Sequence, residues 1–273
     1  MPTTYAHYRF GRDVLEALPR RAAQAAKMNR ELFDIGLHGP DILFYYKALT
    51  PNRISGQGFK MHDKNAAQFF LHGKEVIDRM EDKAAARAYL YGFICHFTLD
   101  SECHPYVEKM IQTSGISHSE IEMEFDRYLL TEDGISPTGY LATGHIHPTM
   151  EHARVIAPFF EDLTAEDVKK ALSSMIVCHK ALMAPNRVKR SLLYGGMKLV
   201  HQYDSLHGMV MSETANPDCS AYCLLLKKLY EAAVPAAADL IIKYQKVLLQ
   251  GEPLPERFQR TFGAGEHWEE LIL

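Results

Sequence analysis

The sequence lacks several features that would place it in a large structural class. No window approaches the roughly 18 consecutive apolar residues of a membrane-spanning helix. No stretch alternates apolar and polar residues over the length of a β-strand, and no repeat or low-complexity segment is present. The chain has five cysteines in 273 residues and a single tryptophan, Trp268. A fold held together by disulfides is therefore not expected.

The chain also lacks a strong excess of charge of either sign. The formal net charge is −4, which gives no general attraction to nucleic acids or anionic membranes. Residues 1–18 lack the basic start and apolar run of a secretory signal peptide. These observations predict a cytoplasmic protein with reduced thiols and no stable membrane insertion.

Helical periodicity, in contrast, recurs through most of the chain. Helices are expected over residues 5–18, 19–33, 65–80, 164–183 and 216–250. Residues 50–65 and 131–158 are expected to be irregular. A chain of 273 residues can bury a large core. The sequence therefore predicts an all-α fold, with a single multi-helix domain spanning residues 1–273.

The strongest functional signal lies in residues 86–128. The first part of this stretch is too apolar for a loop and too long for one strand, which indicates a buried helix. Into it the sequence places His96, Asp100 and His104, four residues apart and therefore on one helix face. Pro105 disfavours helical geometry at the residue before it, so we expect the helix to end or kink there.

A second pair, His118 and Glu122, repeats the four-residue spacing. Spacing alone is weak evidence, because 14 His and 34 acidic residues give roughly two such pairs by chance, and the chain has four. The apolar surroundings of His96 and Asp100 are more informative. A buried carboxylate is usually paired or coordinates a metal. From these residues alone, a metal site and a His–Asp hydrogen bond between helices are equally good interpretations.

Three further candidate ligands precede this stretch: His7, Asp41 and His62. Imidazole and carboxylate ligands suit zinc. Asp100, between two histidines on one helix face, could bridge two ions. Metal ions about 3.5–4 Å apart can activate water and stabilise both oxygens of an in-line attack on a phosphoryl group.

In order and residue type, these candidates resemble the zinc-dependent phospholipase C and nuclease-type family, whose members are all-helical trinuclear zinc phosphodiesterases. The resemblance covers roughly residues 1–130 and is carried by His7, PDILFYY with Asp41, GFKMH with His62, CHFTLDSECHPYV and HSEIEMEFD. It implies one zinc held by Asp41, His62, His96 and Asp100, and a second held by His104, His118 and Glu122. A third would use His7, Asp100 and the amino terminus.

The resemblance also implies a reaction, the hydrolysis of a phosphodiester with two to three zinc ions. Asp41 is then the general base near the attacking water. Phospholipid is the family's expected substrate class, and nucleic acid, the substrate of the nuclease branch, is not favoured. Secreted members bind the third zinc through a mature N-terminal Trp, whereas the only Trp of this chain is Trp268.

Two other interpretations stay open. The dipeptide His62-Asp63, with His38 and Asp100, mimics the helical HD-type phosphohydrolases, but that reading gives His96 and the residues after Asp100 no role. A non-catalytic relative could also keep zinc for stability alone.

The remaining polar residues give weaker signals. Arg187, Lys189 and Arg190 crowd one short segment. Such a cluster can hold a phosphate, but a solvated basic turn is the favoured interpretation. His38 and His145 are expected to be structural or exposed to solvent.

Overall fold

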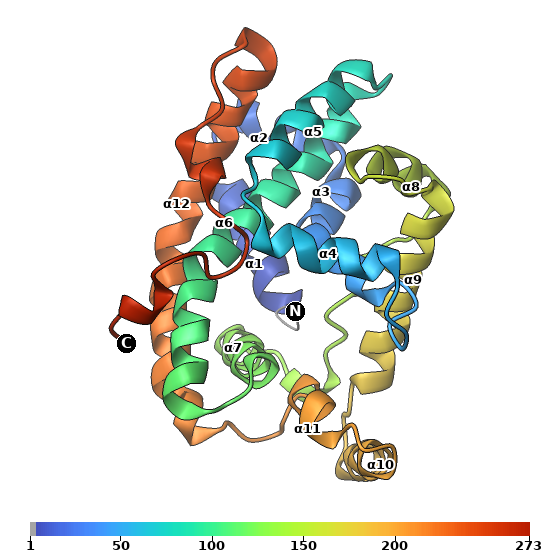
Figure 1. Ribbon diagram of the computed structural model, residues 1–273, viewed down its shortest axis with the longest axis vertical. Helices are drawn as coiled ribbons and strands as arrows, with labels where there is room; N and C mark the ends of the chain where they lie inside the picture. Colours follow the sequence, from blue (N-terminus) through green and yellow to red (C-terminus); the bar gives the residue numbers. More distant parts are fainter. Residues whose placement is uncertain (1–3) are drawn as a thin grey trace.

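The computed structural model describes residues 4–273, and these form twelve α-helices and no β-strand (Figure 1). The predicted all-α fold is confirmed. The α-helices are α1 (Thr4–Ala17), α2 (Arg20–Met28), α3 (Arg30–Gly36), α4 (Arg53–Asp63), α5 (Ala67–Arg79), α6 (Lys83–Ser114), α7 (His118–Glu132), α8 (Met150–Ile156), α9 (Ala165–Leu182), α10 (Arg187–Leu199), α11 (Tyr203–Leu206) and α12 (Ser220–Gln250). The 3-10 helices are η1 (Gly39–Tyr45), η2 (Pro137–Gly139), η3 (Ala157–Phe159), η4 (His207–Met209), η5 (Pro217–Cys219), η6 (Glu256–Gln259) and η7 (Trp268–Glu270). No helix within the described residues has the length and apolar character needed to cross a membrane.

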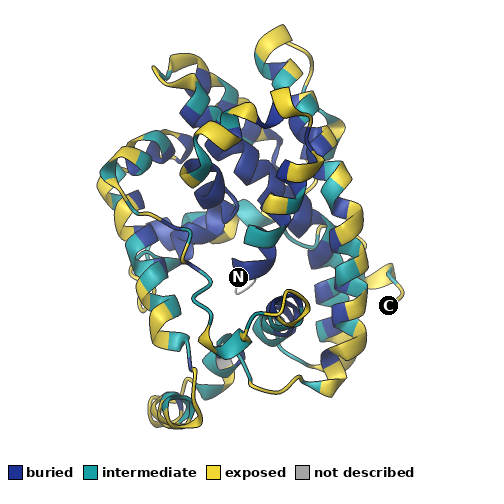
Figure 2. Cartoon of the chain, turned by 180° about the vertical axis from the view of Figure 1, so that it is seen from behind, coloured by how far each residue is buried: buried dark blue, intermediate teal, exposed yellow. Residues whose placement is uncertain are grey.

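Helix α6 is the central element of the fold. The Asp82 carboxylate accepts hydrogen bonds from the N–H groups of Ala84 and Ala85 at its start. Gly115, with a left-handed φ of 72°, ends it. Most side chains from residue 85 to residue 104 are buried, and α1, α2, α3, α5 and α12 pack around them (Figure 2). The apolar stretch seen in the sequence is therefore the core of the molecule.

The sequence predicted that the helix ends or kinks at Pro105. The helix does not end there, so that part of the prediction was wrong. The helix continues to Ser114. A proline inside a helix costs roughly 3 kcal/mol, but the turn after it buries Val107 and Met110 in the core. Packing of this second segment outweighs the local preference. The uninterrupted helix keeps His104 on the same face as the polar residues before it.

Other boundaries also differ from the sequence-based expectations. The helix expected over residues 19–33 is divided at Asn29, whose φ of −119° and ψ of 52° are not helical. The segment 50–65 is not irregular but contains α4, which begins with a capping box between Asn52 and Ser55. The second irregular segment contains α8, and the expected basic turn is the first turn of α10. All five cysteines are free.

Helices α3 and α6 cross where Gly36 faces Gly92. A Cβ atom on Gly92 would lie 2.1 Å from the carbonyl oxygen of Phe33, and one on Gly36 would lie 2.2 Å from that of Tyr89. Both neighbours are backbone atoms, which cannot move without shifting a helix. This crossing fixes the end of α3, and with it the start of η1, against the middle of α6.

We expect Gly92→Ala to lower the free energy of unfolding by about 1–3 kcal/mol, because the added methyl group overpacks the α3–α6 crossing. Gly56→Ala is the matched control, since a Cβ there meets nothing within 4 Å. It should raise stability by about 0.5–1 kcal/mol through helix propensity. Guanidinium unfolding of both variants tests the crossing, and equal effects of the two would contradict it.

Candidate metal centre

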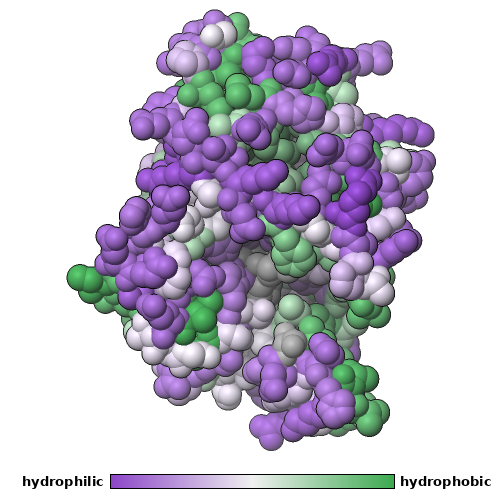
Figure 3. All heavy atoms as spheres, in the orientation of Figure 1, coloured by the Kyte–Doolittle hydropathy of each residue, from purple (hydrophilic) through white to green (hydrophobic). Residues whose placement is uncertain are grey.

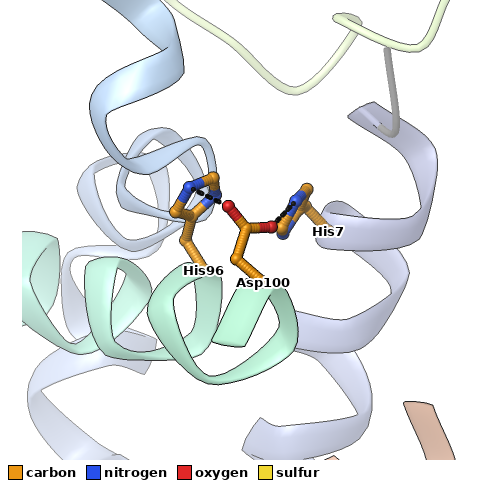
Figure 4. A group of neighbouring side chains, drawn as sticks. All are labelled: His7, His96 and Asp100. Atoms are coloured by element: carbon orange, nitrogen blue, oxygen red, sulfur yellow. Dashed lines mark ion pairs between the residues drawn. The ribbon is translucent and has the colours of Figure 1, made fainter. Parts of the chain in front are cut away.

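The structure brings all eight predicted ligand residues together where α1, η1, α4, α6 and α7 meet. Their potential ligand atoms form three groups, within each of which all atoms lie within 4.8 Å of one another: His7, His96 and Asp100; Asp41, His62 and His96; His104, His118 and Glu122. Figure 4 shows the first group, in which His7 on α1 and His96 on α6 point to opposite oxygens of one carboxylate.

That carboxylate belongs to Asp100, and it lies between four imidazoles. Its Oδ1 atom lies 3.2 Å from Nε2 of His7. Its Oδ2 atom lies 3.0 Å from Nε2 of His96, 3.7 Å from Nε2 of His62 and 3.8 Å from Nδ1 of His104. Burial acts to raise the pKa of Asp100, but His96, His104 and His7 hold it well below its usual range. Asp100 is therefore a buried anion at the junction of the three groups.

The other two carboxylates each face two imidazoles. Oδ1 of Asp41 lies 3.1 Å from Nε2 of His62 and 4.0 Å from Nε2 of His96. Oε1 of Glu122 lies 3.1 Å from Nε2 of His118 and 3.4 Å from the second imidazole of its group. Ligands of a tetrahedral zinc ion lie about 3.4 Å apart, given zinc–ligand bonds of about 2.1 Å. The separations of 3.1, 3.1 and 3.4 Å are close to this value, and that of 4.0 Å is longer.

Three of the imidazoles are oriented by backbone carbonyls. Their Nδ1 atoms donate hydrogen bonds as follows: His62 to Gly58 (2.9 Å), His96 to Leu37 (3.3 Å) and His104 to Phe262 (2.6 Å). A carbonyl only accepts, so Nδ1 carries the proton, and the neutral ring has its lone pair on Nε2. Each Nε2 faces a carboxylate oxygen. Two lone pairs this close require a proton or a cation between them, and such orientation by carbonyls is typical of metal-binding histidines.

Local sequence explains how these groups reach one another. Gly39 has a φ of 48°, and a Cβ there would lie 2.1 Å from the ring of His96. Only glycine allows η1 to approach this ring and to place Asp41 beside it. At the start of α7, the Ser117 hydroxyl accepts the N–H of Glu120 as an N-cap. This cap makes His118 the first residue of the helix.

Two supporting carboxylates were missed in the sequence. Asp126, which is buried, accepts the N–H groups of Tyr5 (3.0 Å) and Ala6 (2.8 Å) and so holds the start of α1, on which His7 lies. Burial raises the pKa of Asp126 to about 8. Glu108 lies 3.5 Å from Nδ1 of His118. Helical spacing pairs Glu108 with His104, and it could also have found Asp126, which follows Glu122 by four residues.

Two of the four residues of the HD-type interpretation, Asp63 and His38, lie outside the three groups. Asp63 is exposed at the end of α4, so of the HD dipeptide only His62 reaches them. His38 is buried with its Nε2 atom 2.7 Å from Nε2 of His145, also outside these groups. The amino terminus, which the resemblance assigns to a third zinc, lies outside the described residues.

Comparison with protein families matches residues 6–177 to the family described as zinc dependent phospholipase C. The chain belongs to this family. The match covers more than half of the chain, includes all eight predicted ligands and continues through α8 into α9. The zinc-dependent phospholipase C family consists of hydrolases, and its zinc dependence agrees with the groups of imidazoles and carboxylates. Comparisons with curated proteins and with solved structures found no match.

In the chelator-treated protein, stability should fall as the pH rises from about 6.5 to 9. The carboxylate of Glu122 raises the pKa of His118 to about 9. Folding therefore favours protonated His118, so its contribution is complete below the unfolded pKa of about 6.5. This contribution is lost as the pH passes through the folded pKa.

Thermal unfolding at several pH values measures this effect. The pKa values of His62 and Asp126 are raised as well, so His118 is isolated by comparison with His118→Gln, which should flatten part of the pH dependence. His72→Gln, on the exposed face of α5, is the control and should follow the wild type. Identical pH profiles for His118→Gln and the wild type would contradict the assignment.

Proposed function

We propose that this protein is a phosphodiester hydrolase of the phospholipase C type that binds two to three zinc ions. The observation that carries the proposal is the position of Asp100, whose two oxygens face imidazoles of different groups. The first zinc is assigned to Asp41, His62, His96 and Asp100, the second to His104, His118 and Glu122, and the third to His7 and Asp100 with the amino terminus.

The donor set fits zinc in chemistry as well as in spacing. Imidazole nitrogens and carboxylate oxygens are ordinary zinc ligands. The carbonyl-oriented rings of His62 and His96 present lone pairs that a cation would satisfy. Zinc held there supplies positive charge to phosphoryl oxygens and lowers the pKa of bound water toward 7.

The protein's own groups would then direct the reaction. The Asp41 carboxylate, held by His62, orients the attacking water and accepts its proton. As the water oxygen bonds to phosphorus, the bond from phosphorus to the leaving alcohol breaks and the alcohol oxygen gains a proton. The products are a phosphomonoester and an alcohol. For a phospholipid, the substrate class that the family suggests, the alcohol is diacylglycerol.

Zinc content tests the ligand assignment. Wild-type protein purified without chelators should hold at least two equivalents of zinc by elemental analysis. Asp100→Asn should lose more than one equivalent and unfold at a lower temperature, because it weakens two sites and leaves buried polar groups unsatisfied. Asp63→Asn is the control and should keep the wild-type content.

A zinc content near zero after repletion of the wild type would contradict the whole proposal. Wild-type zinc content in Asp100→Asn would assign Asp100 to helix pairing instead. Loss of zinc from Asp63→Asn would favour the HD-type alternative.

The role of Asp41 is tested by turnover. We expect Asp41→Asn to lower the hydrolysis of p-nitrophenyl phosphocholine by about 10²–10⁴-fold, the usual range for a general base, while most of the zinc stays bound. Wild-type activity should rise toward neutral pH. Phosphomonoesters and single-stranded nucleic acid are tested in parallel. Activity on nucleic acid alone would indicate the nuclease branch, and no activity in fully metallated protein would indicate structural zinc.

A further inference from the structure

Helix α10 exposes a row of large apolar side chains. Val188, Leu192 and Leu199 follow helical spacing along one face, and Val200 continues it after the last turn. Their exposed fractions are 71%, 71%, 82% and 61%, respectively. Only thirteen large hydrophobic residues are exposed in the described part of the chain. Four of them lie here, where the surface of Figure 3 turns hydrophobic at the lower right.

Basic side chains border this apolar row. Residues 180–204 contain five Lys or Arg residues and one acidic residue, in a chain whose formal charge is −4. Arg187, Lys189 and Arg190 occupy the first turn of α10. Positive charge at a helix N-terminus opposes the helix dipole, so these residues do not serve to stabilise α10. A partner with negative charge would explain their position.

Part of this charge is already engaged within the molecule. Glu213 lies 3.5 Å from Nε of Arg187 and 3.6 Å from Nη1 of Arg190. Lys189 donates to the carbonyl of Lys180 (3.0 Å). Arg190 also donates to the carbonyl of Ala184 (3.3 Å), and its side chain is only 14% exposed. The contacts of Arg187 and Lys189 are exposed and of a kind that contributes little to stability. These two cations therefore remain at the surface beside the apolar row.

The opposite face of α10 is anchored to the protein. Met197 packs with Ala184 and Val210 in a small cluster separate from the main core. The apolar row thus points outward from a supported helix, and Figure 2 shows this helix largely exposed. A helix with one apolar and one polar face, flanked by lysine and arginine, is typical of interfacial membrane binding.

Helix α10 is also connected to both sides of the metal centre. Before it, His179 on α9 lies 3.1 Å from the hydroxyl of Tyr45, in the same 3-10 helix as Asp41. After it, Gly208 packs against the start of α7, where a Cβ on Gly208 would lie 3.0 Å from the N atom of Glu120. The segments before and after α10 therefore contact η1 and α7, which both carry proposed ligands. A surface bound to α10 would lie next to these segments.

We propose that α10 docks the protein on an anionic lipid surface, inserting its apolar row into the interface while the bordering cations face lipid phosphates. The helix lies in the plane of the interface and does not cross the bilayer. This contact goes beyond the hydrolysis proposed above and does not require it.

Co-sedimentation with vesicles tests the proposal. Wild-type protein should bind vesicles of equal parts phosphatidylglycerol and phosphatidylcholine at low salt, and bind pure phosphatidylcholine weakly. Combined Val188→Ser, Leu192→Ser and Leu199→Ser should lower the partition coefficient at least about tenfold. Combined Arg187→Gln and Lys189→Gln should lower it about fivefold per residue, with the effect disappearing at high salt.

Matched controls come from exposed residues elsewhere. Combined Leu49→Ser, Leu224→Ser and Leu249→Ser removes three exposed leucines outside α10, and Lys74→Gln with Arg79→Gln removes two cations on α5. Both should keep wild-type binding. Trp268→Phe with Leu192→Trp places the only tryptophan on α10, and its emission should shift to shorter wavelength when anionic vesicles are added. Circular dichroism verifies that every variant is folded.

Three results would overturn the proposal. The first is that wild-type protein does not bind anionic vesicles. The second is that the control variants lose as much binding as the α10 variants. The third is that the protein does not bind vesicles but forms a dimer, and that the α10 substitutions abolish this dimer. The last would mean that a second copy covers this face. Because binding is read by sedimentation, its failure leaves the zinc chemistry untouched. The α10 variants should hydrolyse a water-soluble ester at the wild-type rate.

Discussion

A carboxylate buried among imidazoles is the constraint on which this architecture depends. Asp100 lies in the buried middle of α6, where an unpaired charge would cost several kcal/mol. Its partners come from α1, α4 and α6 itself, so these helices must converge on one point. The glycines at positions 36, 39 and 92 permit the close approaches that this convergence needs. The need to surround the Asp100 carboxylate with imidazoles thus accounts for both the helix arrangement and the proposed metal site.

The sequence predicted which candidate ligands share a face of α6 because that signal is local, and their binding of metal stays a prediction. Helical spacing put His96, Asp100 and His104 on one face, and the structure keeps them there. The all-α fold followed from periodicity, and the helix expected over residues 164–183 is α9, which a capping box at Thr164 begins. The single-domain organisation and the cytoplasmic location stay predictions.

What the sequence could not reveal depends on distant contacts. The carbonyl that orients His104 belongs to Phe262, which follows it by 158 residues. No spacing rule predicts such a partner. The expected end of the helix at Pro105 was wrong because tertiary packing outweighed a local preference. Helix α10 was missed because basic residues at a helix start oppose helix formation. Local rules failed where packing between distant segments of the chain decides the structure.

The most direct test of the central claim is a crystal structure of the zinc-loaded protein with anomalous scattering measured at the zinc edge. We expect at least two anomalous peaks, one bounded by Asp41, His62, His96 and Asp100 and the other by His104, His118 and Glu122. A third peak beside His7 would complete the trinuclear arrangement. Absence of anomalous signal between these side chains would show that protons, not metal ions, hold the buried carboxylates in place, and would contradict the account.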